Sequence, residues 1–183
     1  MSYDTAINKA WESIIELSPD EIISVKFLGD EYTVNPKDKN VMSLSCNVAA
    51  RDFMAILILH YLIQKLKGLK ELTGEWVSFK ELPTGENYYP SFKTRAIEPI
   101  IRKYGHHTEG ILEVLGRLPA KKINQGDIGI VIEAFTGVPV LITLWRPDDE
   151  FGPEANMLFD KSITEIFCTE DVVVLAGIVA SQL

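Results

Sequence analysis

His60 is the residue of this sequence with the clearest chemical potential. It lies in an almost wholly apolar run from Phe53 to Ile63, a pattern that predicts a buried helix. An imidazole in such surroundings must be hydrogen-bonded, bind a ligand or lie at the rim of a cavity. Gln64 follows four residues later, on the same helical face. His60 is therefore either a structural histidine or, with Gln64, part of a pocket.

Five aromatic residues within a short stretch are candidates for the wall of that pocket: Trp76, Phe79, Tyr88, Tyr89 and Phe92. The stretch is rich in turn-forming residues, and loops of this kind often carry binding groups. Packing of the same side chains in a core explains the cluster equally well. The sequence leaves these two interpretations open.

Arg95 adds a positive charge close to the aromatic residues. A planar guanidinium is well suited to a carboxylate or a phosphate, and Lys93 lies beside it in the sequence. Arg102 is expected on the same helical face, with Glu98 placed to pair with it. Arg95 is therefore a candidate either for a surface ion pair or for a site that binds a small anionic ligand.

The overall charge argues against one class of partner. The 183 residues carry a formal net charge of −8, whereas a general nucleic-acid binder normally has a surplus of Lys and Arg. Residues 65–122 nevertheless contain 11 Lys and Arg against 7 Asp and Glu. This middle third is expected either to form solvated helix faces or to present a basic surface to a small anion.

The remaining motifs exclude more than they indicate. Cys46 and Cys168 are far apart and lack the spacing of a metal site, so we expect no metal, and no cofactor can be named. No phosphate-binding loop, nucleophile elbow or zinc-protease motif occurs, which leaves open whether the chain is an enzyme. The longest apolar run is shorter than the roughly 20 residues that span a bilayer, and no signal peptide is evident. We expect a cytoplasmic protein without a membrane segment.

The periodicity of apolar residues predicts the elements that position these groups. We expect one α+β domain over 1–183, with a mainly antiparallel or mixed sheet, an N-terminal helix, a C-terminal helix and a buried central helix over about 50–67. Asn47 is a candidate N-cap for the central helix. The expected helices are 6–17, 50–67, 90–104, 108–118 and 169–182, and the expected strands are 22–28, 31–34, 41–44, 75–79, 127–135, 138–145 and 156–160.

Four segments carry a resemblance to a known family: Leu59–Leu62, Gly74–Pro83, Pro139–Trp145 and Leu158–Asp160. Over about Asp20 to the C-terminus, the chain resembles a family of domains of unknown function from strictly anaerobic bacteria and archaea. Some relatives look to be fused to iron–sulfur cluster domains, which implies a role in anaerobic redox or one-carbon metabolism. This chain lacks the cysteines for such a cluster, so the cluster would belong to a redox-protein partner.

Three hypotheses for the function follow. The first is a non-catalytic accessory module that binds a small ligand or cofactor near His60, Trp76 and Tyr88. The second is a small enzyme that uses His60 as a general acid/base while Arg95 orients an anionic substrate. The third is a subunit that buries the aromatic segment 76–92 against a partner protein. The sequence does not indicate an oligomeric state.

Overall fold

One antiparallel sheet runs through the whole chain. A computed structural model describes residues 3–183 and shows five α-helices and a nine-stranded sheet with the order β4-β3-β2-β1-β7-β8-β9-β5, in which β6 also pairs with β7. The predicted α+β class is confirmed, with a helix near each end of the chain and a buried central helix.

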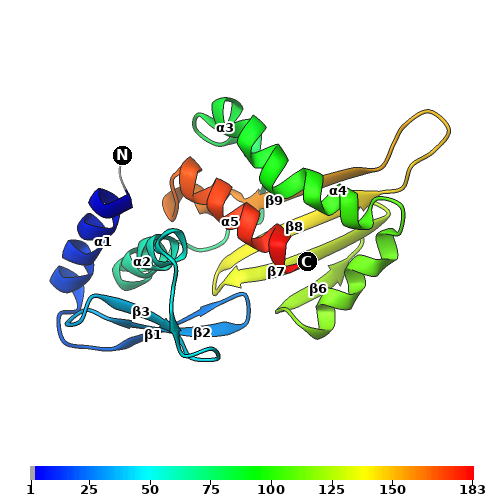
Figure 1. Ribbon diagram of the computed structural model, residues 1–183. Helices are drawn as coiled ribbons and strands as arrows, with labels where there is room; N and C mark the ends of the chain where they lie inside the picture. Colours follow the sequence, from blue (N-terminus) through cyan, green and yellow to red (C-terminus); the bar gives the residue numbers. More distant parts are fainter. Residues whose placement is uncertain (1–2) are drawn as a thin grey trace.

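The N-terminal part of the sheet is a meander covered by two helices (Figure 1). It contains α1 (Tyr3–Leu17), β1 (Ile23–Phe27), β2 (Asp30–Asn35), β3 (Asn40–Ser43) and β4 (Val48–Ala49). Leu28 and Gly29 form the β1–β2 turn with φ values of 51° and 85°, the positive values that a tight two-residue hairpin turn requires. The expected strands 22–28 and 31–34 are therefore confirmed and form a hairpin, with its turn at 28–29 and not at 29–30.

Helix α2 (Asp52–Lys67) is the predicted central helix, and its residues from Ala55 to Leu59 are all buried. It does not begin at Asn47, which instead adopts a left-handed φ of 52°. Asparagine tolerates this conformation because its short side chain can hydrogen-bond to the local backbone. The turn at Asn47 allows β4 to pair with β3, and Arg51 is the N-cap of the helix.

The C-terminal part of the sheet is built around a long hairpin. Strands β7 (Ile128–Phe135) and β8 (Val138–Trp145) are joined by Thr136 and Gly137, as the sequence predicts. Strands β9 (Glu154–Asp160) and β5 (Trp76–Ser78) continue the sheet beyond β8, and β6 (Ala120–Ile123) pairs with β7. The two parts of the sheet join where Phe27 of β1 pairs with Phe135 of β7.

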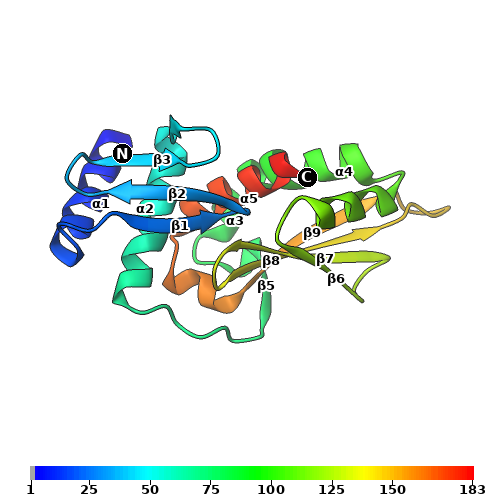
Figure 2. The same ribbon diagram turned by 90° about the horizontal axis from the view of Figure 1, so that it is seen from below.

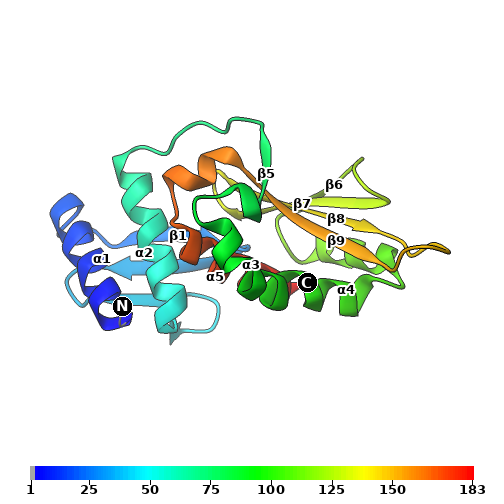
Figure 3. The ribbon, with the colours of Figure 1, turned by 90° about the horizontal axis from the view of Figure 1, so that it is seen from above.

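Helices cover one face of this C-terminal sheet (Figure 2). The covering layer is a nearly continuous helical rod followed by the C-terminal helix. It consists of η1 (Phe79–Glu81), α3 (Gly85–Phe92), the π-helical turn η2 (Lys93–Ile97), α4 (Glu98–Tyr104), the 3₁₀ helix η3 (Thr108–Gly116) and α5 (Thr169–Gln182), and a short 3₁₀ turn, η4 (Lys161–Glu165), connects β9 to α5. Helix α5 packs against α2 and against α3 and η2 of the rod, so two other parts of the chain meet around it (Figure 3).

Two predicted helices differ from those observed. The rod begins at Gly85, five residues before Pro90, so this proline lies inside α3 and not in the first turn of the helix. The segment after Gly105 is a 3₁₀ helix and not an α-helix. Among the helices that the structure describes, none combines the length and apolar character needed to cross a bilayer.

Candidate functional site

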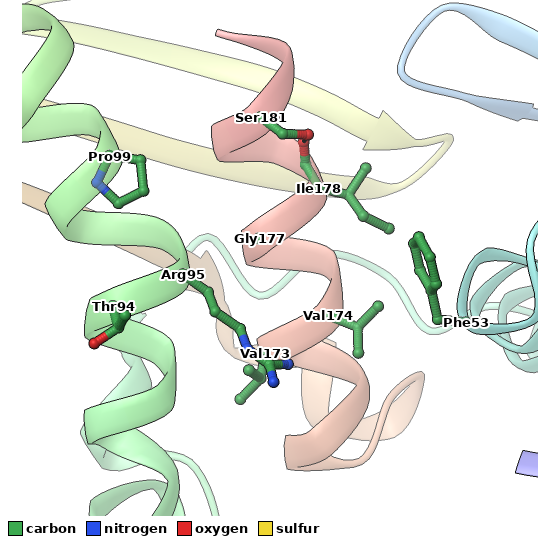
Figure 4. A pocket seen from close by; sticks show the side chains of 9 residues that line it. All are labelled: Phe53, Thr94, Arg95, Pro99, Val173, Val174, Gly177, Ile178 and Ser181. Carbon is green, nitrogen blue, oxygen red and sulfur yellow. Dashed lines mark hydrogen bonds between the residues drawn. The ribbon is translucent and has the colours of Figure 1, made fainter.

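A cleft of about 470 Å³ lies where α2, α5 and the π-helical turn meet (Figure 4). Helix α5 forms its floor, Phe53 of α2 forms one wall, and the π turn with Pro99 of α4 forms the other. We call it the Arg95 cleft. Its lining residues are Phe53, Thr94, Arg95, Pro99, Val173, Val174, Gly177, Ile178 and Ser181.

Proline explains why the rod distorts at this point. Pro99 has no backbone N–H with which to bond the carbonyl of Arg95, and its ring would crowd that carbonyl in a regular helix. The rod widens into a π turn, in which the N–H of Glu98 donates to the carbonyl of Lys93, five residues back. Such π turns are frequent at functional sites. This one places Thr94 and Arg95 at the edge of the cleft.

Helix α5 passes directly beneath the π turn. A Cβ built on Gly177 would lie 3.5 Å from Cβ of Arg95 and 3.9 Å from its carbonyl oxygen, so the two backbones are almost in contact. The C-terminal end of α5 is also held in place, because the carbonyl of Leu183 accepts hydrogen bonds from Lys103, Tyr104 and Arg117. The floor of the cleft is therefore fixed at both the π turn and the C-terminal end.

The cleft combines an apolar interior with one exposed cation. The Arg95 side chain extends across the face of α5 toward Val173 (Figure 4). Among the side chains that the structure describes, none forms an ion pair or hydrogen bond with its guanidinium. No lining residue is acidic, and Ser181 directs its hydroxyl to the carbonyl of Ile178 at 2.7 Å. The arrangement suits an anionic group carried on an apolar body.

His60 lies beyond the cleft on α2, where its ring contacts the start of α5. Its Nδ1 is 2.8 Å from Oδ2 of Asp171, and the two side chains are 30% and 13% exposed. Next to this pair, the Tyr88 hydroxyl donates to Glu170. Gln64 is half-buried one turn further along α2. Nδ1 of His60 and the hydroxyl of Tyr88 thus have partners within the domain.

Cys168, the N-cap of α5, adds no nucleophile to this cluster. Desolvation of its sulfur, reinforced by the carboxylate of Asp171, raises the pKa of the thiol to about 12. The thiol therefore stays protonated at neutral pH, whereas a reactive cysteine requires a lowered pKa. Among residues 3–183, no group of three or more His, Cys, Asp and Glu side chains is placed to hold a metal ion.

Three of the five predicted aromatic residues pack on one another. Phe79 and Phe92 are buried and stacked, with ring centroids 4.3 Å apart, and Tyr89 lies 6.0 Å from Phe92. Trp76 is half-buried on the edge strand β5, opposite Asp160. The structure therefore unites Arg95 with the cleft, joins Tyr88 to the start of α5 beside His60, and places Phe79 and Phe92 in the core.

Most residues that line the cleft could not be predicted as site residues from the sequence. Phe53, Val174 and Ile178 belong to apolar helices whose residues all predict core packing. Pro99 is the one local signal, because a proline within a helical segment predicts a distortion. The glycine in α5 is a second sign, since a glycine inside a helix often marks a close approach of two backbones.

Residues 9–182 match the family model described as "Domain of unknown function (DUF3786)", and the chain therefore belongs to this family. A comparison with curated proteins gave no significant match. A comparison with solved structures gave none either.

Proposed function

We propose that this domain is a small-molecule-binding module that holds an organic anion in the Arg95 cleft. The observation that carries the proposal is the exposed guanidinium, unpaired among the described side chains, above a cleft of about 470 Å³ with apolar walls. Small-ligand sites typically have a volume of this order and a few placed polar groups. A carboxylate or phosphate on Arg95, with its apolar part against Val174 and Ile178, satisfies both features.

Binding of octanoate by isothermal titration calorimetry tests this proposal. Arg95→Gln should weaken binding about 10-fold or more, because it removes a charge-assisted hydrogen bond. Arg102→Gln is the matched control, since Arg102 is exposed on α4 and does not line the cleft. The affinity of this variant for octanoate should stay within about twofold of the native value. Equal affinities for all three proteins would contradict the proposal.

The biological setting that we propose is an accessory role in anaerobic metabolism in the cytoplasm, alongside a redox-protein partner. What supports this setting is the resemblance to relatives that are fused to iron–sulfur domains. Native mass spectrometry of the protein purified anaerobically from its own cells should detect a small organic anion or a co-purifying chain. A ligand-free monomer that also fails to bind octanoate would count against both the setting and the site.

A second candidate function is supported by the contact between His60 and Asp171. A carboxylate 2.8 Å from Nδ1 fixes the orientation of the ring and leaves Nε2 for acid/base chemistry. His60 lies seven residues beyond Phe53 on α2, which corresponds to about 10 Å along a helix. A substrate anchored at Arg95 would have to extend beyond the cleft toward Asp171 at the start of α5 to reach His60.

A further inference from the structure

A second cavity adjoins the Arg95 cleft at the C-terminal end of α5. It has a volume of about 340 Å³ and lies between the N-terminal meander, the start of α2 and the end of α5. We call it the meander cavity. Phe53, Ile178 and Ser181 line both cavities, and Figure 4 shows the ring of Phe53 facing Ile178 at this boundary. The two hollows therefore meet at these three residues, and we call this boundary the neck.

The lining of the meander cavity is mixed, with apolar side chains beside polar and charged ones, among them Cys46, Arg51 and Gln182. Val48, Ala49, Ala50 and Met54 line it together with the shared residues. Asp30, Tyr32 and Ser43 of the meander line it as well. The neck and these four apolar residues offer apolar surface to an alkyl chain, and Asp30 and Tyr32 of β2 with Ser43 of β3 offer polar groups.

Tyr32 supplies hydrogen-bonding capacity among these polar groups. Its side chain is buried, and its hydroxyl lies 3.3 Å from the sulfur of Met54, a weak acceptor. Burial of the ring and the neighbouring Asp30 carboxylate raise the pKa of Tyr32 to about 12, so the hydroxyl stays protonated. Asp30 accepts from Ser43 at 2.9 Å. A ligand group at this point meets a protonated phenol and a carboxylate.

We infer that the two cavities hold one elongated organic anion of the acyl-chain class. Its carboxylate or phosphate binds Arg95, its chain passes the neck between Phe53 and Ile178, and a terminal hydrogen-bonding group reaches Tyr32 and Asp30. This inference rests on the proposed function, because it requires the anion at Arg95. Beyond the proposed function, the inference specifies the length of the ligand and the chemistry of the end that lies away from Arg95.

A series of carboxylates of increasing chain length, from hexanoate to hexadecanoate, tests the length. In the native protein, affinity should rise about two- to fourfold per methylene while the chain enters apolar surroundings. Ala49→Trp fills the meander cavity from an exposed position that does not line the Arg95 cleft. In this variant the rise should stop at a shorter chain, with the affinity for hexanoate unchanged. Ala49→Leu provides a milder block if the tryptophan variant does not fold.

The ω-hydroxy derivative of the longest carboxylate that binds tests the far end. Tyr32→Phe removes only the hydroxyl and should abolish an approximately fivefold preference for the ω-hydroxy chain over the plain chain. If affinity stopped rising at the same chain length in the native protein and in both Ala49 variants, the inference that one ligand occupies both cavities would be overturned and the proposed function would remain. Absence of the ω-hydroxy preference in the native protein would overturn the polar end. Failure of every chain to bind would overturn the proposed function itself.

Discussion

The aromatic segment 76–92 and the Arg95 cleft occupy neighbouring positions along the same helical layer, yet they are built in opposite ways. In the aromatic segment, Phe79 and Phe92 are buried against each other. In the cleft, a guanidinium has no described partner, and apolar side chains border a hollow. The filled region stabilises the fold, whereas the hollow region leaves a space that the described side chains do not fill.

The boundary between these regions is the π turn. Upstream of it, α3 packs on α5 and η1, with Tyr88 bonded to Glu170. From Thr94 onward the rod borders the cleft. A regular helix would place its side chains at even angular steps, whereas the extra residue of a π turn displaces the following positions. This local irregularity marks the point from which the rod borders the hollow, although Ala96, Ile97 and Ile100 in and beyond it remain buried.

Phe92→Ala should have the largest effect on the filled region. Phe92 is 2% exposed and stacks on Phe79, with Phe159 edge-on at 6.3 Å. Removing a buried phenyl ring typically costs about 3–5 kcal/mol of the free energy of unfolding. Urea denaturation measures this loss, and Tyr89→Phe, which deletes only a hydroxyl, serves as the control at below about 0.5 kcal/mol.

A loss below about 1 kcal/mol for Phe92→Ala would break the comparison. It would mean that the ring contributes little to the core and that the segment 76–92 is available to a ligand or partner. The loss that we expect would leave only Trp76, Tyr88 and Tyr89 of the five aromatics with surface for a partner, because these three are half-buried.

Asp160→Asn should have the second-largest effect, because Asp160 ties the aromatic segment to the sheet. Its carboxylate accepts from the backbone N–H groups of Thr73 at 3.0 Å, Gly74 at 2.7 Å and Ser162 at 2.9 Å. Burial alone would raise the pKa of this carboxyl, but the hydrogen bonds lower it to about 2. An asparagine offers one acceptor atom in place of two, so we expect a loss of about 2–3 kcal/mol at neutral pH.

The pH dependence sharpens this prediction. Because the folded pKa lies below the ordinary value of about 3.9, the contribution of Asp160 is complete above that value and is lost as the pH falls toward about 2. The difference between native protein and variant should therefore shrink over this window in urea denaturation. Asp149→Asn is the control. A stability difference between the native protein and Asp160→Asn that does not change with pH would contradict a lowered pKa of Asp160.

Local patterns explain which parts of the fold were predictable. The β7–β8 hairpin has β-branched strands joined by Thr136 and Gly137, and α2 has an unbroken apolar stretch. Strand β6 was missed because Lys121 and Lys122 make half of its four residues charged. Its pairing with β7 is a tertiary contact that no local pattern encodes. The start of α3 was missed because a proline fits both the first turn and a distorted interior.

The candidate site was predictable only at Arg95. A guanidinium in a basic segment indicates an anion regardless of the fold. The hollow beside it arises because Phe53, Arg95 and Ile178, from three distant parts of the chain, meet without filling the space between them. The apolar residues that line the cleft lie in the same helical periodicity as the apolar residues that are fully packed in the core. Cavities of this kind follow from tertiary geometry and not from periodicity.

His60→Ala should have the smallest effect of the three, and it tests where the filled region ends. The variant leaves the Asp171 carboxylate, 13% exposed, without the imidazole at 2.8 Å. Loss of one hydrogen bond to a charged group predicts a decrease of about 1–2 kcal/mol in the free energy of unfolding. Gln64→Ala, half-buried one turn further along α2, is the matched control at below about 0.5 kcal/mol.

Octanoate binding by the same variant decides the role of this histidine. If His60 belongs to the filled region, the variant loses stability but binds octanoate as tightly as the native protein, because His60 does not line the Arg95 cleft. A loss of binding with folding retained would instead extend the site along α5 to His60 and Asp171. The imidazole would then face the ligand, and the acid/base function would become the stronger of the two proposals. The same substitution therefore separates a histidine that holds two helices together from one that acts on a bound anion.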